Sequence, residues 1–301
     1  MQQKQYSYTF IIPHFNIPVL LIRCLKSIPE REDIQVIVVD DCSPNVDLYH
    51  DQYPEIFSHK NLEFYSTEKG GSAGRARNIG LSHAQGKWLI FADSDDMFAE
   101  NVCQIMDQYY EQDYDVIYFA SATVDNETLR PVENRMTAIV NGIKLNNLDQ
   151  MRYGNYVPWA KLIKRSVVVE NHIYYDETIV CNDAMFSIKL GHFAKEIKCD
   201  PTVIYISTVR EGSLFYGVSK ERIQIRYEVK KRINQQLAKW QQRKSKPLMI
   251  HEVQSLKKIS YSIYLRELFC CLEGQPLNML LFDLKRTFLY ILKSPFRAIL
   301  K

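Results

Sequence analysis

Residues 70–96 read GGSAGRARNIGLSHAQGKWLIFADSDD, and this stretch decides the fold. Glycines open a pattern with helical spacing over Ser72–Ala84, and the short apolar run Lys87–Ala92 follows it. Four polar residues, Asp93–Asp96, end the run. A short, continuous apolar run is typical of a strand that is buried on both faces, as in a parallel sheet. The stretch therefore predicts a helix, a buried strand and a polar turn, in that order.

The sequence on the amino-terminal side repeats this alternation of strand and helix. Tyr8–Ile12 and Gln35–Val39 are short apolar runs, Leu62–Tyr65 is a third, and Ile17–Ile28 has apolar residues at helical spacing. Alternating strands and helices predict an α/β fold in which a mostly parallel sheet is flanked by helices.

Three of the expected strands end in polar residues. These ends are Pro13–Asn16, Asp40–Asp41 and Asp93–Asp96. Because the carboxyl ends of parallel strands meet at one edge of a sheet, we expect a ligand site there.

The turn Asp93–Asp96 contains carboxylates at D-x-D spacing. Asp93 and Asp95 can hold a hard divalent cation such as Mn²⁺ or Mg²⁺ through oxygen, and that ion can bridge two phosphates. The alternative is a solvated acidic turn that caps a helix beginning near Ala99. The position of the turn after a buried strand favours the metal hypothesis.

Two further segments suit a nucleotide. Asp41 ends the strand QVIVV, where a carboxylate can accept a hydrogen bond from a base or a ribose hydroxyl. The alternative is a turn formed with residues 43–45. The loop Gly70–Asn78 offers backbone N–H groups and arginines, which suit phosphate.

The remainder of the chain has weaker patterns and a shift in charge. Strands are expected over 116–121 and 202–207, and helices near 142–152 and 182–193. From Ser219 onward the chain holds 18 Lys and Arg against 6 Asp and Glu, a net charge of +12, whereas the earlier residues carry 20 against 29, a net charge of −9. We therefore expect an α/β domain over residues 1–218 and a basic helical region over 219–301.

The basic region predicts helices over 219–246, 251–273 and 277–300. Within it, Leu277–Lys301 mixes apolar residues with five cations and one acid. Such a segment can lie on an anionic membrane surface, or it can pack its apolar face on the body of the protein. Both alternatives stay open.

Composition excludes several classes of protein. The seven cysteines contain no C-x-x-C pair, which argues against a disulfide framework or a zinc site and for a reducing compartment. No run approaches the roughly 18 apolar residues of a membrane span, and the first residues lack a signal-peptide pattern. We expect a cytoplasmic protein, which would lie on the inner face of the membrane if the basic segment binds lipid. We expect no nucleic-acid partner. The sequence does not indicate an oligomeric state.

Three runs of the sequence form a set: FIIPHFN (10–16), VVDDCSPN (38–45) and GGSAGRARNIGLSHAQGKWLIFADSDD (70–96). Together they resemble the nucleotide-binding half, here about residues 1–100, of family 2 glycosyltransferases of the GT-A fold. The resemblance implies that Pro13, Phe15 and Asp41 lie around the base, usually uracil, and that Asn16 also belongs to the donor-binding site. It also implies that residues 101–218 form the acceptor half of the domain. Phe15 stands where the family usually has Tyr, and Cys42 where it usually has Gly.

The same resemblance assigns roles at the phosphates and at the acceptor. Arg77 and Asn78 would lie near the nucleotide, and Asp93 and Asp95 near ribose, diphosphate and metal. The run TVREGSLFY (208–216) is similar to a family loop near the donor phosphates, which would place Arg210 there.

CNDAMFS (181–187) resembles the segment that contains the family's catalytic base, which would be Asp183, although Asn182 replaces the usual preceding acid. VPWAKLIKRS (157–166) is similar to a W-x-K-L segment, in which Trp159 is a candidate for stacking on an acceptor sugar.

The resemblance implies an inverting transfer of a hexose or N-acetylhexosamine. The donor would be a nucleotide diphosphate sugar, with a UDP-sugar as the first expectation, and the acceptor a glycan or glycolipid of a bacterial surface. A sugar-phosphate nucleotidyltransferase is the first alternative, although the segment after the first strand, PHFNIPV, lacks the glycine-rich basic loop of that class. A non-catalytic nucleotide-sugar-binding module of the same fold is the second.

Overall fold

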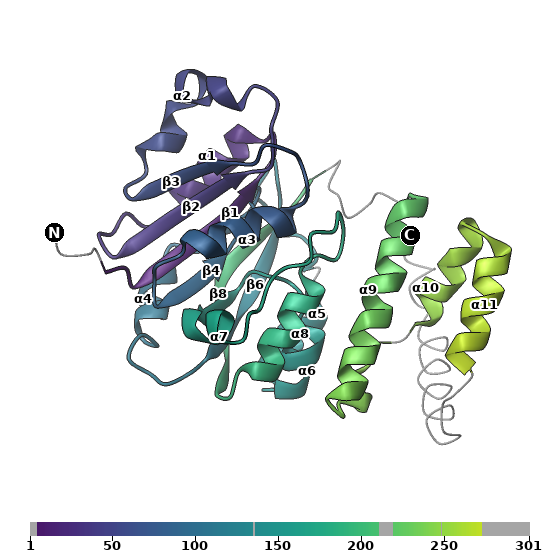
Figure 1. Ribbon diagram of the computed structural model, residues 1–301. Coiled ribbons are helices and arrows are strands. Elements are labelled where there is room, and N and C mark those ends of the chain that lie inside the picture. Colours follow the sequence, from purple (N-terminus) through teal and green to yellow (C-terminus); the bar gives the residue numbers. More distant parts are fainter. Residues whose placement is uncertain (1–4, 135, 211–218, 248, 273–301) are drawn as a thin grey trace. The chain divides into compact units, whose positions relative to one another are not determined.

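The computed structural model describes residues 5–134, 136–210, 219–247 and 249–272 (Figure 1). The chain forms two compact units, Met1–Tyr216 and Gly217–Lys301. The first unit contains a sheet with helices on both faces. The α/β architecture that the sequence predicts is therefore confirmed.

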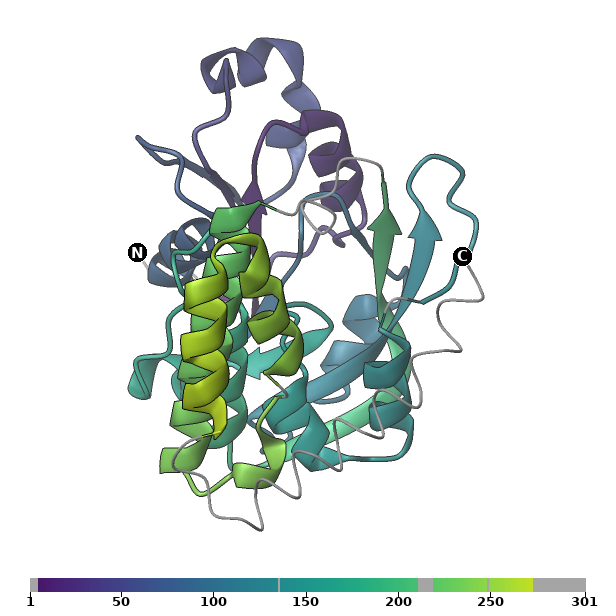
Figure 2. The same ribbon diagram turned by 90° about the vertical axis from the view of Figure 1, so that its right-hand side faces the viewer.

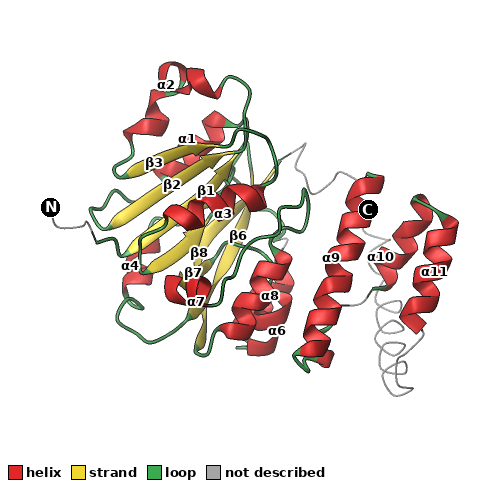
Figure 3. Ribbon diagram, viewed as in Figure 1, coloured by secondary structure: helices red, strands yellow, loops and turns green. Residues whose placement is uncertain are grey.

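Within the described residues, eight strands of the first unit form one mixed sheet (Figure 3). They are β1 (Tyr8–His14), β2 (Ile34–Asp40), β3 (Leu62–Ser66), β4 (Trp88–Phe91), β5 (Met97–Phe98), β6 (Val116–Asp125), β7 (Lys161–Lys164) and β8 (Ile197–Val209). Their order is β3-β2-β1-β4-β7-β6-β8-β5. The pairs β1–β2, β1–β4 and β2–β3 are parallel. β6 and β8 are also parallel, and they lie side by side as the two long strands of Figure 2.

Two strands were not predicted from the sequence. β7 pairs antiparallel with both β4 and β6, and the two-residue β5 pairs antiparallel with β8. β7 has the sequence KLIK, and its first residue, Lys161, is almost completely buried. A four-residue strand with a lysine at each end lacks the apolar pattern by which strands are recognised.

Helices cover both faces of the sheet, which explains why the strands are apolar at successive positions. One core includes α1, α2 and α4, and the other includes α3 and α5 to α8. In β1, Phe10 and Ile12 contribute to the first core and Ile11 to the second. The helices are α1 (Pro18–Lys26), α2 (Tyr49–Gln52), α3 (Ala73–His83), α4 (Val102–Asp107), α5 (Thr137–Lys144), α6 (Leu148–Gly154), α7 (Arg165–Glu170) and α8 (Ala184–Phe193).

The prediction of one helix near 142–152 is wrong, because two short helices, α5 and α6, occupy this region. Asn146 has φ 49°, a left-handed conformation that ends a helix. The Asn147 side chain then accepts a hydrogen bond from the backbone N–H of Gln150 and caps α6. The adjacent asparagines were the missed signal.

Among its described residues the second unit contains α9 (Lys220–Lys239), α10 (Ile250–Ser255) and α11 (Tyr261–Leu272). Ile223 and Tyr227 of α9 form a core with Val253 and Leu256. The buried Glu267 of α11 accepts a hydrogen bond from Tyr227 Oη. These contacts tie α11 to α9 within this unit.

The expected helix over 219–246 is too long, because α9 ends at Lys239 and Gln241 has the left-handed φ of 60°. The expected helix over 251–273 is two helices with a 3₁₀ turn between them. The segment 277–301, proposed above as a membrane contact, lies outside the described residues. In the described part of the chain, the helices are too short or too polar to cross a membrane.

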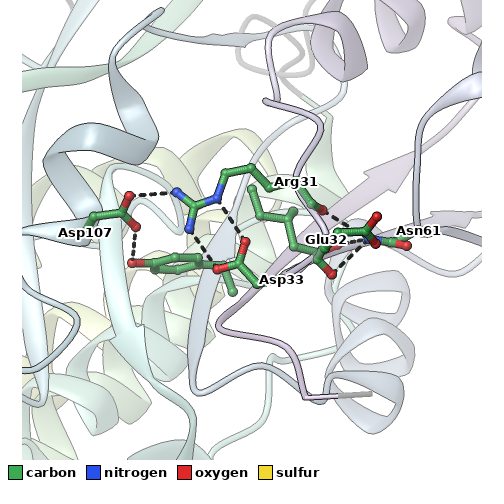
Figure 4. Close-up of polar contacts among 7 residues, drawn as sticks. Arg31, Glu32, Asp33, Asn61 and Asp107 are labelled. Carbon is green, nitrogen blue, oxygen red and sulfur yellow. Dashed lines mark hydrogen bonds and ion pairs between the residues drawn. The ribbon is translucent and has the colours of Figure 1, made fainter. Parts of the chain in front are cut away.

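A polar cluster at the amino-terminal edge of the sheet joins β1, the start of β2 and α4 (Figure 4). The Arg31 guanidinium donates two hydrogen bonds to Asp33, at 2.9 and 2.7 Å, and a third to Asp107 at 2.7 Å. Tyr8 Oη donates to the other Asp107 oxygen at 2.9 Å. Bidentate arginine–carboxylate pairs are strong and directional. Because this edge is opposite to the polar strand ends, we assign the cluster to stability.

We expect Arg31→Met to lower the free energy of unfolding by about 1–3 kcal/mol, because it removes three charge-assisted hydrogen bonds. The Arg31 and Asp33 side chains are 32% and 31% exposed, so water offsets part of the loss. Denaturant unfolding measures the change. The control Lys60→Met removes an exposed pair with Glu32 and should cost less than about 0.5 kcal/mol. Equal losses in the two variants would contradict a stabilising role for the cluster.

Candidate active site

The polar turn after β4 is held in place by β8. Asp96 is buried, and its carboxylate accepts hydrogen bonds from Tyr205 Oη and from the Thr208 backbone N–H, both at 2.7 Å. Tyr205 Oη also accepts from the Asp93 backbone N–H at 2.9 Å. Asp96 therefore fixes the turn, and the other two carboxylates of the turn have different partners.

Arg77 of α3 joins this turn to the start of α8. The residue is buried; Nη2 donates to Asp93 Oδ1 at 2.6 Å, and Nη1 donates to Asn182 Oδ1 at 2.9 Å. The guanidinium also lies over the Tyr175 ring, 5.3 Å from its centroid. One arginine thus holds a D-x-D carboxylate and the residue before Asp183 together.

Asp95 contacts a second arginine, Arg210, which follows β8. Arg210 Nε donates to Asp95 Oδ2 at 3.0 Å, and both side chains are partly exposed. The Asp95 carbonyl oxygen accepts from Arg23 Nη2 at 2.6 Å and from Thr208 Oγ1 at 2.9 Å. The backbone of the turn is therefore anchored, while the Asp95 carboxylate stays accessible beside an arginine.

Two carboxylates of the turn, Asp93 and Asp96, have a raised pKa. Burial raises the pKa of Asp93; Arg77 opposes this shift and Asp95 adds to it. Burial raises the pKa of Asp96 well above its usual value, and the charges of Asp93 and Asp95 raise it further. The two arginines offset part of this negative charge, and a divalent cation would offset more.

Asp93 and Asp95 fit such a cation in their donor chemistry. Carboxylate oxygens suit Mg²⁺ and Mn²⁺, and Mg²⁺ usually keeps further positions for water and substrate phosphates. Among the residues that the structure describes, no group of three or more His, Cys, Asp or Glu side chains is arranged to hold a metal ion. Substrate phosphates and water would supply further oxygen ligands beside the two carboxylates.

Asp183 immediately precedes α8 as its N-cap residue, and its side chain makes no capping hydrogen bond. Its carbonyl oxygen accepts from the Ser187 backbone N–H at 2.9 Å, which begins the helix. Burial raises the pKa of Asp183; Arg77 and Lys161 act against this shift, and Asp93 adds to it. A carboxylate whose pKa is raised toward neutrality is suited to accept a proton.

Asp41 ties the end of β2 to the glycine loop. Its carboxylate accepts from the Gly71 backbone N–H at 3.0 and 3.1 Å and from Thr67 Oγ1 at 3.3 Å. Cys42, where the family usually has glycine, has φ 65°. The turn thus keeps the left-handed conformation that glycine favours.

The residues expected around a base lie at the ends of β1 and β2. The buried Asp40 accepts from the Ser43 backbone N–H at 2.7 Å and from Ser43 Oγ at 2.5 Å. Ser43 Oγ also accepts from the Asn16 backbone N–H at 2.7 Å. Pro13 is buried, whereas Phe15 is 55% exposed and offers a ring face to a planar group. Asp40 therefore supports the turn that places the neighbouring residues.

Asn78, which the family resemblance places near the nucleotide, makes a structural contact with the segment before α8. Asn78 Nδ2 donates to the Tyr175 carbonyl at 3.0 Å, and Oδ1 accepts from the Tyr175 backbone N–H at 2.8 Å. Both ends of the amide therefore hold the segment that leads to Asp183.

Gly74 allows α3 to approach the loop before α8. A Cβ at this position would lie 2.0 Å from the carbonyl oxygen of Asp176 and 2.9 Å from Asn182 Cβ. We expect Gly74→Ala to displace this loop from Arg77 and to lower the free energy of unfolding by about 1–3 kcal/mol, measured by denaturant unfolding. Gly154→Ala is the control, because a Cβ at this position would lie 3.6 Å from its nearest neighbour, Gln150 Cγ. This variant should have little effect on stability. A harmless Gly74→Ala would show that the loop adjusts freely.

Sequence reasoning missed three residues of this site: Arg23, Tyr205 and Lys161. Tyr205 lies in the expected strand 202–207, and a tyrosine in a buried strand needs a hydrogen-bond partner for its hydroxyl group, which was the available signal. Arg23 contacts the turn from α1 across 72 positions of sequence, and no local pattern signals such a contact.

Comparisons with known proteins identify a family and a fold for this chain. The family model described as Glycosyl transferase family 2 matches residues 9–171, which is more than half of the chain. The minor teichoic acid biosynthesis protein GgaB of Bacillus subtilis is 29% identical over 144 residues, or 43% of this chain and 16% of GgaB. The poly(ribitol-phosphate) beta-N-acetylglucosaminyltransferase TarS of Staphylococcus aureus is 25% identical over 214 residues, or 68% of this chain and 36% of TarS. The chain thus spans well under half the length of either relative.

Two solved structures have a similar fold. S. aureus TarS 1–349 in complex with UDP-GlcNAc gives a TM-score of 0.61 at 23% identity and covers 83% of this chain and 70% of that chain. A mannosyltransferase from Pyrobaculum calidifontis in complex with GDP-Man and Mn²⁺ gives 0.56 at 15% identity and covers 98% of this chain and 83% of that chain. The expected GT-A fold is confirmed.

Proposed function

This chain belongs to glycosyl transferase family 2, and from that premise we propose that it transfers a sugar from a nucleotide diphosphate sugar to an acceptor hydroxyl. The observation that carries the proposal is the double contact of Arg77 with Asp93 and Asn182. It brings the D-x-D turn, the proposed diphosphate site, next to Asp183, the proposed base. A transferase needs its leaving group and its acceptor at one point, because holding both reactants in line lowers the barrier.

The proposed donor is a UDP-sugar carrying a hexose or an N-acetylhexosamine. Phe15 and Asp41 at the ends of β1 and β2 would hold the base, with Pro13 and Asn16 shaping the same turn. The TarS structure that resembles this chain contains UDP-GlcNAc, which motivates uracil as the first base to test.

The proposed cofactor is Mn²⁺ or Mg²⁺, held by Asp93 and Asp95. When bound, such a cation supplies charge stabilisation for the diphosphate that departs. Arg210, which contacts Asp95 from a partly exposed position, would add a donor to the same phosphates. Arg77 is buried against Asp93 and would hold that carboxylate in place.

The proposed base is Asp183. It would accept the proton of the acceptor hydroxyl as the acceptor oxygen attacks the anomeric carbon on the face opposite to the diphosphate, so that the configuration inverts. Trp159 is buried, and its ring stacks on Tyr205 with centroids 4.8 Å apart. We propose that it borders the acceptor region, where it would limit the space for the acceptor.

The proposed acceptor is a glycan or glycolipid of a bacterial surface, at the inner face of the cytoplasmic membrane. The names of GgaB and TarS refer to teichoic acid and poly(ribitol-phosphate), which motivates this class of acceptor. The segment 277–301, which would contact the membrane, lies outside the described residues and is a separate part of this proposal.

A panel of UDP- and GDP-sugars, assayed for release of the nucleoside diphosphate with and without EDTA, tests the proposal. We expect hydrolysis of at least one UDP-sugar, and its loss with EDTA. Absence of binding and of hydrolysis across the panel would contradict the proposal. Binding without turnover would favour a non-catalytic module.

A further inference from the structure

We propose that Lys161 is a positioning residue, which holds the loop before Trp159 and the first turn of α8 in one arrangement. This inference rests on the proposed function. Lys161 begins β7 and is 1% exposed. Its Nζ donates to the carbonyl oxygens of Val157 at 2.6 Å and Asn155 at 3.0 Å, and to Ser187 Oγ at 3.3 Å. The cation therefore contacts both segments that it would align.

Three successive carbonyl groups of the loop are bonded through this arrangement. Lys161 binds the first and the third, and Ser187 Oγ donates to the second, that of Tyr156, at 2.9 Å. Carbonyl groups that are withdrawn from water need such hydrogen bonds, because an unpaired one is costly. Trp159 follows two residues after the loop, so its position depends on this support.

The other side of the arrangement is the turn that contains the proposed base. Ser187 lies one turn after Asp183, and its backbone N–H donates to the Asp183 carbonyl at 2.9 Å. The hydrogen bond from Lys161 to Ser187 therefore also restrains the backbone of Asp183. Buried charges destabilise a fold unless they are paired or fully hydrogen-bonded, and they are best explained where they fix one arrangement.

Lys161 also acts on Asp183 through its charge. Burial lowers the pKa of Lys161 to about 7, and Asp183 acts against this shift. The groups that face Asp183 are Arg77 from α3, Asp93 from the turn after β4, Tyr175 from the preceding segment, and Lys161 from β7. Below about pH 7 the protonated lysine favours ionised Asp183. Removing the lysine charge should therefore raise the pKa of Asp183.

The test compares Lys161→Met, which keeps the apolar stem, with Lys164→Met on the same strand, which breaks a surface contact with Asp113. UDP release from the UDP-sugar that the wild type hydrolyses fastest is followed against pH, and UDP binding is measured by calorimetry. We expect Lys161→Met to lower kcat about tenfold or more. It should move the acid limb of the pH–activity profile to a higher pH, by about 0.5–1 pH unit. The Kd for UDP should stay within about twofold of the wild-type value. Lys164→Met should match the wild type in all three readouts.

Hydrogen exchange of the amides in 155–160 and 184–193 gives a readout that does not depend on activity. Protection should fall in Lys161→Met and, less strongly, in Ser187→Ala, which decides the matter if the first variant does not fold. Unchanged protection together with an unmoved acid limb would overturn the inference. A wild type that neither binds UDP nor hydrolyses any UDP-sugar would overturn the proposed function, and this inference with it.

Discussion

Asp183→Asn is expected to lower kcat by about 10²–10⁴ while leaving the affinity for UDP nearly unchanged, because the substitution removes a proton acceptor and keeps the shape of the side chain. Steady-state assays of UDP release give kcat, and calorimetry gives the affinity for UDP. Asp183 makes no capping hydrogen bond, so the substitution should cost α8 little. Loss of UDP binding in this variant would instead make Asp183 a donor-binding or structural residue.

The pH profile of the wild type offers an independent check on the same residue. Burial raises the pKa of Asp183, so the base loses its negative charge at a higher pH than an exposed aspartate would. Activity should therefore fall as the pH drops through a value above the ordinary Asp pKa of about 4. An acid limb at or below about pH 4 would contradict a raised pKa for Asp183.

Asp95→Asn is expected to lower turnover by about 10²–10³, and to abolish the gain in UDP affinity that Mn²⁺ confers on the wild type. Asp95 is partly exposed beside Arg210, and its loss removes a charged oxygen ligand without disturbing the core. Calorimetric titration of UDP with and without Mn²⁺ measures the effect.

Asp96→Asn is the matched control in the same turn. Asp96 is buried on Tyr205 and Thr208, so we expect a loss of stability of about 1–3 kcal/mol with the response to Mn²⁺ retained. If Asp96→Asn lost the Mn²⁺ response and Asp95→Asn kept it, the assignment of the metal ligands would be wrong.

The amino-terminal half of the fold could be predicted because its strands are buried on both faces. A strand such as QVIVV carries its own signal, and its polar ending marks the edge where ligands bind. β7 could not be predicted, because Lys161 is buried by contacts with residues that the local sequence does not identify. The break between α5 and α6 depends on one left-handed asparagine, a local feature that helical periodicity does not detect.

The carboxylates of the candidate site could be predicted from the sequence. The contacts that hold them in place could not. Asp93 and Asp95 follow a strand, and Asp183 precedes a helix, so each position is visible in the sequence. The Arg77 contact with Asn182 spans 105 positions and arises only from folding. It also gives a physical role to Asn182, which departs from the family pattern: its neutral oxygen accepts from Arg77 while Asp93 keeps the ion pair.

Product analysis by nuclear magnetic resonance tests the central claim most directly. The wild-type protein is mixed with Mn²⁺ and an α-linked UDP-sugar that it hydrolyses, and the first products are recorded before the free sugar mutarotates. Inverting glycosyl transfer to water predicts UDP together with the β-anomer of the sugar. Release of UMP and sugar 1-phosphate, or of the α-anomer, would contradict the account.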